Sequence, residues 1–229
     1  LSYAMEFCPG TSLQDIFVYE NLKEDTVKYT INKVLDSYEY CFLNGPMIVD
    51  ESSKYMWIDK NLKRFESYIY PFIDKEDLQL IKDVVKSETY SNLIKQNSVV
   101  NCIHGDLHFG NILFDYNIGK VKFIDPRGNW CSTDTVKGDI EYDISKLYQS
   151  VYCEYMWIIN NVKVNQNLKD FLLKELDMRY DGDKYRLLSA IMMSSCLPFH
   201  NENGKGTIRW RDSLYIPAGL GIYKYINGT

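Results

Sequence analysis

Two aspartates and an asparagine near the middle of the chain have the side chains and the spacing to handle magnesium-bound phosphate. They lie in His104-Gly-Asp-Leu-His-Phe-Gly-Asn111 and in Ile124-Asp-Pro-Arg-Gly128. Asp106 and Asn111 are five positions apart, and Asp125 follows fourteen positions later, after a short apolar run. Phosphoryl transfer needs a group that orients the attacking hydroxyl and hard oxygen ligands that hold Mg²⁺ on the nucleotide phosphates. Asp106 can accept the hydroxyl proton, and Asn111 and Asp125 can bind the metal.

Short strands are predicted on either side of these residues. Ser98–Ile103 is rich in β-formers, and Asn111–Phe114 and Val121–Ile124 are short apolar runs. Asp115–Gly119 lies between the last two runs and has the composition of a hairpin turn. The candidate residues are therefore expected on loops between short strands.

Helices are predicted for most of the remaining chain. Thr11 or Ser12 is expected to cap the first helix, and Asp74 to cap a later one. Apolar residues spaced by three and four positions, or helix-forming composition, mark further segments at 25–42, 55–69, 74–96, from 139 onward, 166–178 and 183–196. We expect an α+β fold that is mostly α-helical, with a small β-hairpin at the site.

The composition excludes several classes of protein. The hydrophobic share of 45% and the charged share of 25% are those of a globular domain. A net charge of −5 argues against a nucleic-acid surface, which needs clustered Lys and Arg. The six cysteines form no C-x-x-C pair, and neither a signal peptide nor a membrane-spanning run is visible, so a cytoplasmic location is predicted.

The pattern His-x-Asp-x-x-x-x-Asn resembles the catalytic loop of protein-kinase-like enzymes. His104-Gly-Asp-Leu-His108 with the following Gly110-Asn-Ile-Leu113 resembles most closely the aminoglycoside phosphotransferase and choline kinase superfamily. The resemblance runs from about residue 5 to about residue 150 and is tight only at the two motifs. It implies that Asp106 is the catalytic base and that Asn111 and Asp125 bind Mg²⁺.

The same resemblance implies roles for residues around the motif. Met5-Glu-Phe-Cys-Pro-Gly10 is similar to the hinge between two lobes, where Glu6 and Phe7 would contact the adenine of ATP, or the base of GTP, through their backbone. His104 would brace the loop, and Asp143 would support its backbone from the start of the next helix. We therefore expect a hinge-like strand at 1–10 and a C-terminal catalytic lobe at 11–229. We also expect that the chain is a fragment that lacks the N-terminal lobe and has little activity of its own.

Several residues have two readings in the sequence. His104 could be a base or a metal ligand, although a buried structural histidine is favoured because oxygen ligands suit magnesium better. His108 either faces the acceptor or packs in the loop. His200 and Glu202 could line the acceptor pocket, and Arg127 either meets a phosphate or substrate anion or is ion-paired.

Two departures from the protein-kinase pattern narrow the function. Gly105 stands where protein kinases have Arg, and Pro126-Arg127-Gly128 follows the second aspartate in place of Phe-Gly, so a protein substrate is disfavoured. The predicted function is ATP-dependent phosphorylation of a hydroxyl on an aminoglycoside, a choline-like amino alcohol or a sugar-like acceptor. The alternative is a catalytically inactive kinase-like binding or regulatory module. The sequence leaves the oligomeric state open.

Overall fold

The computed structural model describes residues 8–43, 47–48, 52–70, 75–95, 99–100, 102–130, 133–134, 136–196 and 198. This part of the chain is mostly helical and carries small antiparallel sheets, in agreement with the predicted α+β class. The predicted hinge residues Glu6 and Phe7, and the candidate pocket residues His200 and Glu202, lie outside the described residues.

The first helices begin where the sequence predicts them. Strand β1 (Thr11–Ser12) leads into α1 (Leu13–Tyr19), and the Ser12 hydroxyl caps this helix by accepting from the Asp15 amide at 3.0 Å. Helix α2 (Glu24–Tyr38) continues into the π-helical turn η1 (Glu39–Leu43). The predicted helix at 25–42 is thus confirmed, with a widened last turn.

The next two predicted helices are divided more finely in the structure. Helix α3 (Ser52–Lys54), the π-helical turn η2 (Tyr55–Asp59) and α4 (Lys60–Ser67) form one continuous helical stretch. The single helix predicted at 74–96 is wrong, because α5 (Lys75–Lys86) and α6 (Glu88–Lys95) are separated at Ser87. The Ser87 hydroxyl accepts from the Tyr90 amide at 3.1 Å and so starts a new helix instead of continuing the old one.

The predicted hairpin is confirmed. A 3-10 turn, η3 (Phe109–Asn111), runs directly into β4 (Ile112–Asp115), which pairs with β5 (Lys120–Phe123). Ile112 lies opposite Phe123 and Asp115 opposite Lys120, and β1 adds to the other edge of β4. The hairpin register therefore fixes where the chain leaves β5 relative to the loop at His104–Asn111.

Two further small antiparallel sheets are present in the described residues. Strands β2 (Met47–Ile48), β3 (Val99–Val100) and β8 (Gly138–Asp139) form one, so the strand predicted at Ser98–Ile103 is shorter than expected. Strands β6 (Asn129–Trp130) and β7 (Thr133–Asp134) form the other.

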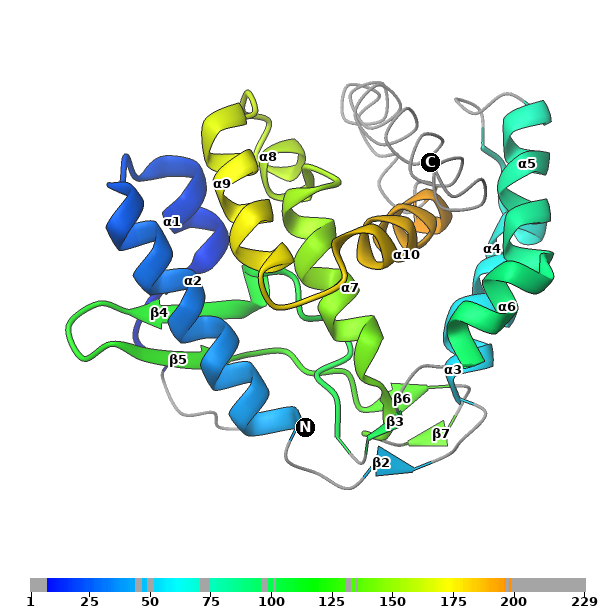
Figure 1. The fold of residues 1–229 in the computed structure, drawn as a ribbon, viewed down its shortest axis with the longest axis horizontal. Coiled ribbons are helices and arrows are strands. Elements are labelled where there is room, and N and C mark those ends of the chain that lie inside the picture. Colours follow the sequence, from blue (N-terminus) through cyan, green and yellow to red (C-terminus); the bar gives the residue numbers. More distant parts are fainter. Residues whose placement is uncertain are drawn as a thin grey trace, which may run out of the picture.

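The C-terminal helices pack around α7 (Ile140–Val151), which is capped by Asp139 and buried along almost its whole length. It is followed by α8 (Tyr155–Ile159), α9 (Gln166–Asp177) and α10 (Gly182–Cys196). In Figure 1, α7 lies at the centre, with α9 and α10 next to it, while α2 lies against the β4–β5 hairpin. None of the helices within the described residues is both long and apolar enough to cross a membrane.

Candidate active site

Backbone hydrogen bonds join the two motifs of the sequence. The Ile124 amide donates to the Asn111 carbonyl at 3.0 Å, which extends the hairpin pairing by one step. The Arg127 amide donates to the His104 carbonyl at 2.8 Å. Because Asp125 directly follows Ile124, these bonds bring Asp125 and Asn111 to the same edge of the hairpin.

Helix α7 holds the start of the catalytic loop through Asp143. One carboxylate oxygen accepts from the His104 amide and the other from the Gly105 amide, each at 2.7 Å. Gly105 has a φ of +80°, a conformation that glycine adopts without strain. Asp143 is fully buried, and burial raises the pKa of its carboxyl to about 7 even though the two amides bind it. The contact is the one that the resemblance implies for Asp143.

The same face of α7 holds the rest of the loop. The Lys146 ammonium lies 2.9 Å from Asp106 Oδ1, and the Ser150 hydroxyl accepts from the Phe109 amide at 2.9 Å. Residues three, four and seven positions apart share one side of a helix, so Lys146 and Ser150 lie along the side that carries Asp143. One helix face therefore binds successive parts of the loop.

The Asp106 carboxylate has a cation at each oxygen. Arg127 Nη2 lies 3.2 Å from Oδ2, opposite Lys146 at Oδ1. Burial acts to raise the pKa of Asp106, but Lys146 and Arg127 outweigh it and hold this pKa well below its usual range. Asp106 is thus ionised at neutral pH and accepts hydrogen bonds, and it is a weak proton acceptor until the reacting hydroxyl becomes acidic.

Asn111 and Asp125 have the donor set that Mg²⁺ prefers. The Asn111 side-chain amide donates to the Asp106 carbonyl at 2.9 Å, which orients the amide and leaves its oxygen as the ligand atom. Asp125 is exposed and has a φ of +55°. Within the described residues, no group of three or more His, Cys, Asp or Glu side chains could hold a metal. A carboxylate and a carboxamide fit an ion that completes its shell with phosphate oxygens and water.

His104 has both ring nitrogens engaged. The Asp106 amide donates to Nδ1 at 3.2 Å, so the proton lies on Nε2, which donates to the Ile124 carbonyl at 2.9 Å. The side chain is fully buried, and burial lowers the pKa of the imidazole. Neither nitrogen is left for a base or a metal ligand, so the geometry favours the structural reading.

His108 has one engaged nitrogen and packs against an aromatic ring. Its Nδ1 accepts from the Gly110 amide at 3.1 Å, and its ring meets Tyr155 edge to face at 5.4 Å between centroids. Burial lowers the pKa of His108 to about 4, so the ring is neutral at pH 7 and carries its proton on Nε2. His108 therefore packs in the loop and also keeps one N–H donor.

Sequence reasoning missed Lys146 and Ser150. A signal for Lys146 was present, because it lies three positions after Asp143 on a predicted helix and so must share the face that meets the loop. The pairing of Arg127 with Asp106 joins residues from two different motifs, and only the folded structure reveals it.

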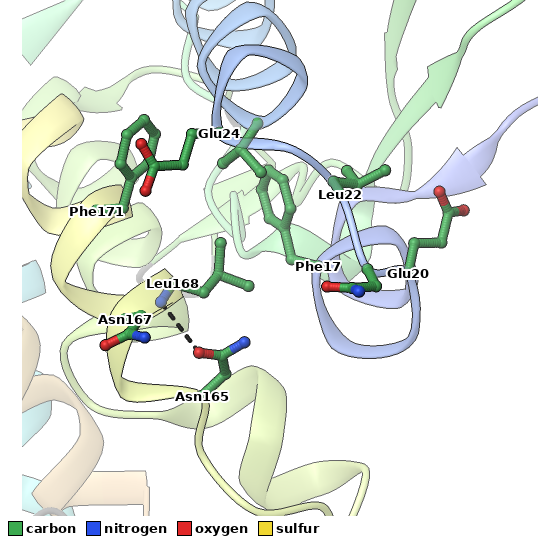
Figure 2. Close-up of a pocket in the computed structure, with 10 residues that line it drawn as sticks. Phe17, Glu20, Leu22, Glu24, Asn165, Asn167, Leu168 and Phe171 are labelled. Atoms are coloured by element: carbon green, nitrogen blue, oxygen red, sulfur yellow. Dashed lines mark hydrogen bonds between the residues drawn. The ribbon is translucent and has the colours of Figure 1, made fainter.

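A surface pocket of about 200 Å³ has none of the candidate residues in its lining, and Figure 2 shows it. Its walls come from α1, the segment between α1 and α2, the start of α2 and the start of α9. Inside it, Asn165 caps α9 by accepting from the Leu168 amide at 3.2 Å. The lining residues are Phe17, Glu20, Asn21, Leu22, Glu24, Val27, Asn165, Asn167, Leu168 and Phe171, and all of them lie outside the two motifs.

Comparison with known proteins gives limited information. No protein-family model matches the chain, and no curated protein matches its sequence. Among solved structures, the chain is similar to Plasmodium vivax ethanolamine kinase Pv091845, with 16% identity and a TM-score of 0.47. The match covers 93% of this chain and 63% of that kinase, so the chain spans less than two thirds of its length. At this identity and TM-score, the likeness leaves the family of the chain open.

Proposed function

We propose that the chain carries the catalytic site of a small-molecule kinase of the kind that the two motifs resemble. It would transfer the γ-phosphoryl group of ATP, or of GTP, to a hydroxyl of an aminoglycoside, an amino alcohol or a sugar-like acceptor. One arrangement carries the proposal: the Lys146 ammonium lies 2.9 Å from Asp106 Oδ1, and the bond from the Ile124 amide to the Asn111 carbonyl brings the backbone of Asp125 close to that of Asn111.

In this proposal Asp106 orients the acceptor. Its Oδ2 would accept a hydrogen bond from the attacking hydroxyl. The proton would pass to the carboxylate as the new oxygen–phosphorus bond forms and the bond between the γ-phosphorus and the leaving nucleoside diphosphate breaks. The low pKa of Asp106 favours late transfer of the proton, when the hydroxyl has become acidic. Positioning is therefore the larger part of its contribution.

Asn111 and Asp125 would hold Mg²⁺, and the bound metal would neutralise part of the negative charge on the phosphates. The Asn111 amide is already turned by its bond to the Asp106 carbonyl, so the metal side and the acceptor side of the site share one backbone segment. His104 and Asp143 would keep that segment in place, because they bind the amides of Gly105 and Asp106 and the carbonyl of Ile124.

Four residues stay predictions from the sequence. Glu6 and Phe7 would contact the nucleotide base, and His200 and Glu202 would face the acceptor. All four lie outside the described residues.

Nucleotide turnover by the full-length protein, measured over a panel of hydroxyl acceptors, tests the proposal. With an acceptor that is phosphorylated, Asp106→Asn should lower kcat by about 100-fold or more, since a positioned acid–base group contributes about 10²–10⁴. Asp170→Asn is the matched control, because Asp170 is exposed on α9 and binds only its helix neighbour Gln166 in the contacts described. A kcat within threefold of wild type for Asp106→Asn would remove Asp106 from this role. Nucleotide binding without turnover on any acceptor would favour the inactive binding module.

A further inference from the structure

Asp106 is outnumbered by the cations that touch it. Lys146 lies 2.9 Å from one oxygen and Arg127 lies 3.2 Å from the other, so these three side chains carry a net charge of +1. His108 beside them is neutral at pH 7, because burial lowers its pKa to about 4. An acceptor whose hydroxyl reaches Asp106 therefore meets two cations there.

Further basic side chains lie next to Lys146. The Lys60 ammonium donates to the Tyr142 hydroxyl at 2.7 Å, and Lys60 and Lys146 lie 4.6 and 5.9 Å from the centre of the Tyr142 ring. Burial acts to raise the pKa of the Tyr142 phenol, yet Lys60 and Lys146 outweigh it and lower this pKa. Arg64, one turn after Lys60 on α4, donates to the Cys196 sulfur at 3.0 Å.

The two cations that pair with Asp106 differ in how far their side chains are exposed to solvent. The Lys146 side chain is 8% exposed and is fixed in the interior, whereas the Arg127 side chain is 47% exposed. The Arg127 backbone is anchored through its bond to the His104 carbonyl, but its guanidinium reaches solvent. Arg127 is thus the partner that a ligand can draw away from Asp106, while Lys146 keeps the carboxylate in place.

We propose that the acceptor carries an anionic group, a phosphate or a carboxylate, a few bonds from the hydroxyl that is phosphorylated, and that Arg127 binds this group. The inference rests on the proposed function and deepens it by naming the charge of the substrate. On binding, the anion takes Arg127, and the hydroxyl donates to Asp106 Oδ2, which Arg127 leaves. Lys146 stays on Oδ1. Arg127 exchanges Asp106 for the anion, and Asp106 Oδ2 exchanges Arg127 for the hydroxyl, so neither is left unpaired.

The same exchange predicts that a cationic acceptor binds weakly. The ammonium group of an amino alcohol or an aminoglycoside would meet Lys146 and Arg127 near Asp106, and like charges oppose binding. It would also displace Arg127 without offering it a new anion. Of the acceptors considered above, the site therefore favours sugar-like compounds that carry a phosphate or a carboxylate.

A matched series of three-carbon alcohols tests the charge preference. Glycerol 3-phosphate, glycerate, glycerol and 3-amino-1,2-propanediol share one framework and present a phosphate, a carboxylate, no charge and an ammonium. Their dissociation constants from the nitrogen-15-labelled protein are measured by NMR titration with Mg-ATP present. We expect one or both anions to bind at least about tenfold more tightly than glycerol, and the ammonium compound to bind most weakly. The two anions compared with each other separate a phosphate site from a carboxylate site.

Variants of Arg127 assign the preference to this side chain. Arg127→Gln should reduce the anion preference to about the level of glycerol, and Arg127→Lys should keep most of it. Arg179→Gln is the matched control, since Arg179 pairs with Asp36 and Glu39 far from the motifs in sequence, and it should leave the preference unchanged.

Three results would overturn the inference. The first is that all four alcohols bind equally or that none binds detectably. The second is that the ammonium compound binds most tightly. The third is that the anion preference survives Arg127→Gln while the affinity for Mg-ATP falls. The last would assign Arg127 to the nucleotide phosphates. Because binding is measured without turnover, the two proposals can fail separately. An anion preference without transfer to any acceptor would refute the kinase function, and transfer to the ammonium compound in preference to the anions would refute only the anionic acceptor.

Discussion

Replacing Asp143 with alanine removes the contact through which α7 holds the start of the catalytic loop. The carboxylate accepts from the His104 and Gly105 amides at 2.7 Å each, and it is fully buried. In Asp143→Ala, both amides lose a charge-assisted acceptor, and the alanine side chain offers them no new one. The backbone at Gly105 is then free to leave the φ of +80° that places Asp106.

The size of the loss follows from these two bonds. A buried donor left unpaired costs about 1–3 kcal/mol, so two such donors cost about 2–6 kcal/mol. Removing a carboxylate whose burial is itself unfavourable offsets part of this, and we expect a net loss of about 3 kcal/mol at pH 7. For a protein of this size, that corresponds to a fall in Tm of about 10 °C. Asp143→Asn keeps one acceptor and should lose about half as much.

The pH dependence of this loss has a definite sign. The pKa of Asp143 is about 7 in the folded protein, against about 3.9 in an unfolded chain. A carboxyl with a raised folded pKa contributes stability that is full below the unfolded pKa and is lost as the pH rises through the folded pKa. The difference between wild type and Asp143→Ala should therefore narrow from about pH 4 to about pH 8.

Urea unfolding followed by circular dichroism, at several pH values, measures the loss. Asp170→Ala is the control and should stay within about 0.5 kcal/mol of wild type, because its carboxylate is exposed. A loss below about 1 kcal/mol for Asp143→Ala at pH 7 would refute the idea that these two bonds fix the loop. A loss of stability in Asp143→Ala that grows as the pH rises would refute the raised pKa of Asp143.

Two further substitutions test the surroundings of the site. Lys146→Met should cost about 2–3 kcal/mol at pH 7 in urea unfolding, because it removes the buried partner of Asp106. Since Lys146 and Arg127 depress the pKa of Asp106, this stability is present above the unfolded pKa of about 3.9 and is lost as the pH falls. The cost at pH 7 should therefore exceed the cost at pH 3, and the opposite order would contradict the ion pair. Trp57→Phe removes the indole N–H that donates to buried Asp139 Oδ2 at 2.7 Å and should cost about 2 kcal/mol. A Tm within 1 °C of wild type in scanning calorimetry, where about 2–4 °C per kcal/mol is expected, would show that this bond is dispensable.

Local signals in the sequence predicted much of the fold. The Ser12 cap and the turn between β4 and β5 depend on neighbouring residues alone, and both are present as predicted. The break at Ser87 was missed because apolar residues spaced by three and four positions lie on both sides of it, and only the hydrogen bond to Tyr90 reveals the new start. The shortened strand at 98–103 depends on its partners β2 and β8, which a single segment does not show.

The sequence likewise predicts only part of the candidate site. The order and spacing of Asp106, Asn111 and Asp125 are visible in the sequence, and the hairpin register then brings the last two together. The charges around Asp106 were not visible, because Lys146 and Arg127 approach it from positions 40 and 21 residues later in the chain. Net charge was a poor guide for the same reason: in a chain with a net charge of −5, two cations contact the Asp106 carboxylate.

The contacts between α7 and the catalytic loop also constrain the order of folding. Asp143 binds a residue 39 positions earlier and Ser150 binds one 41 positions earlier, so the helix must close a long segment of chain onto the loop. The entropy of closing such a segment opposes these bonds until α7 packs in the core. The loop should therefore acquire its geometry late, and during synthesis it cannot do so before the residues of α7 have left the ribosome.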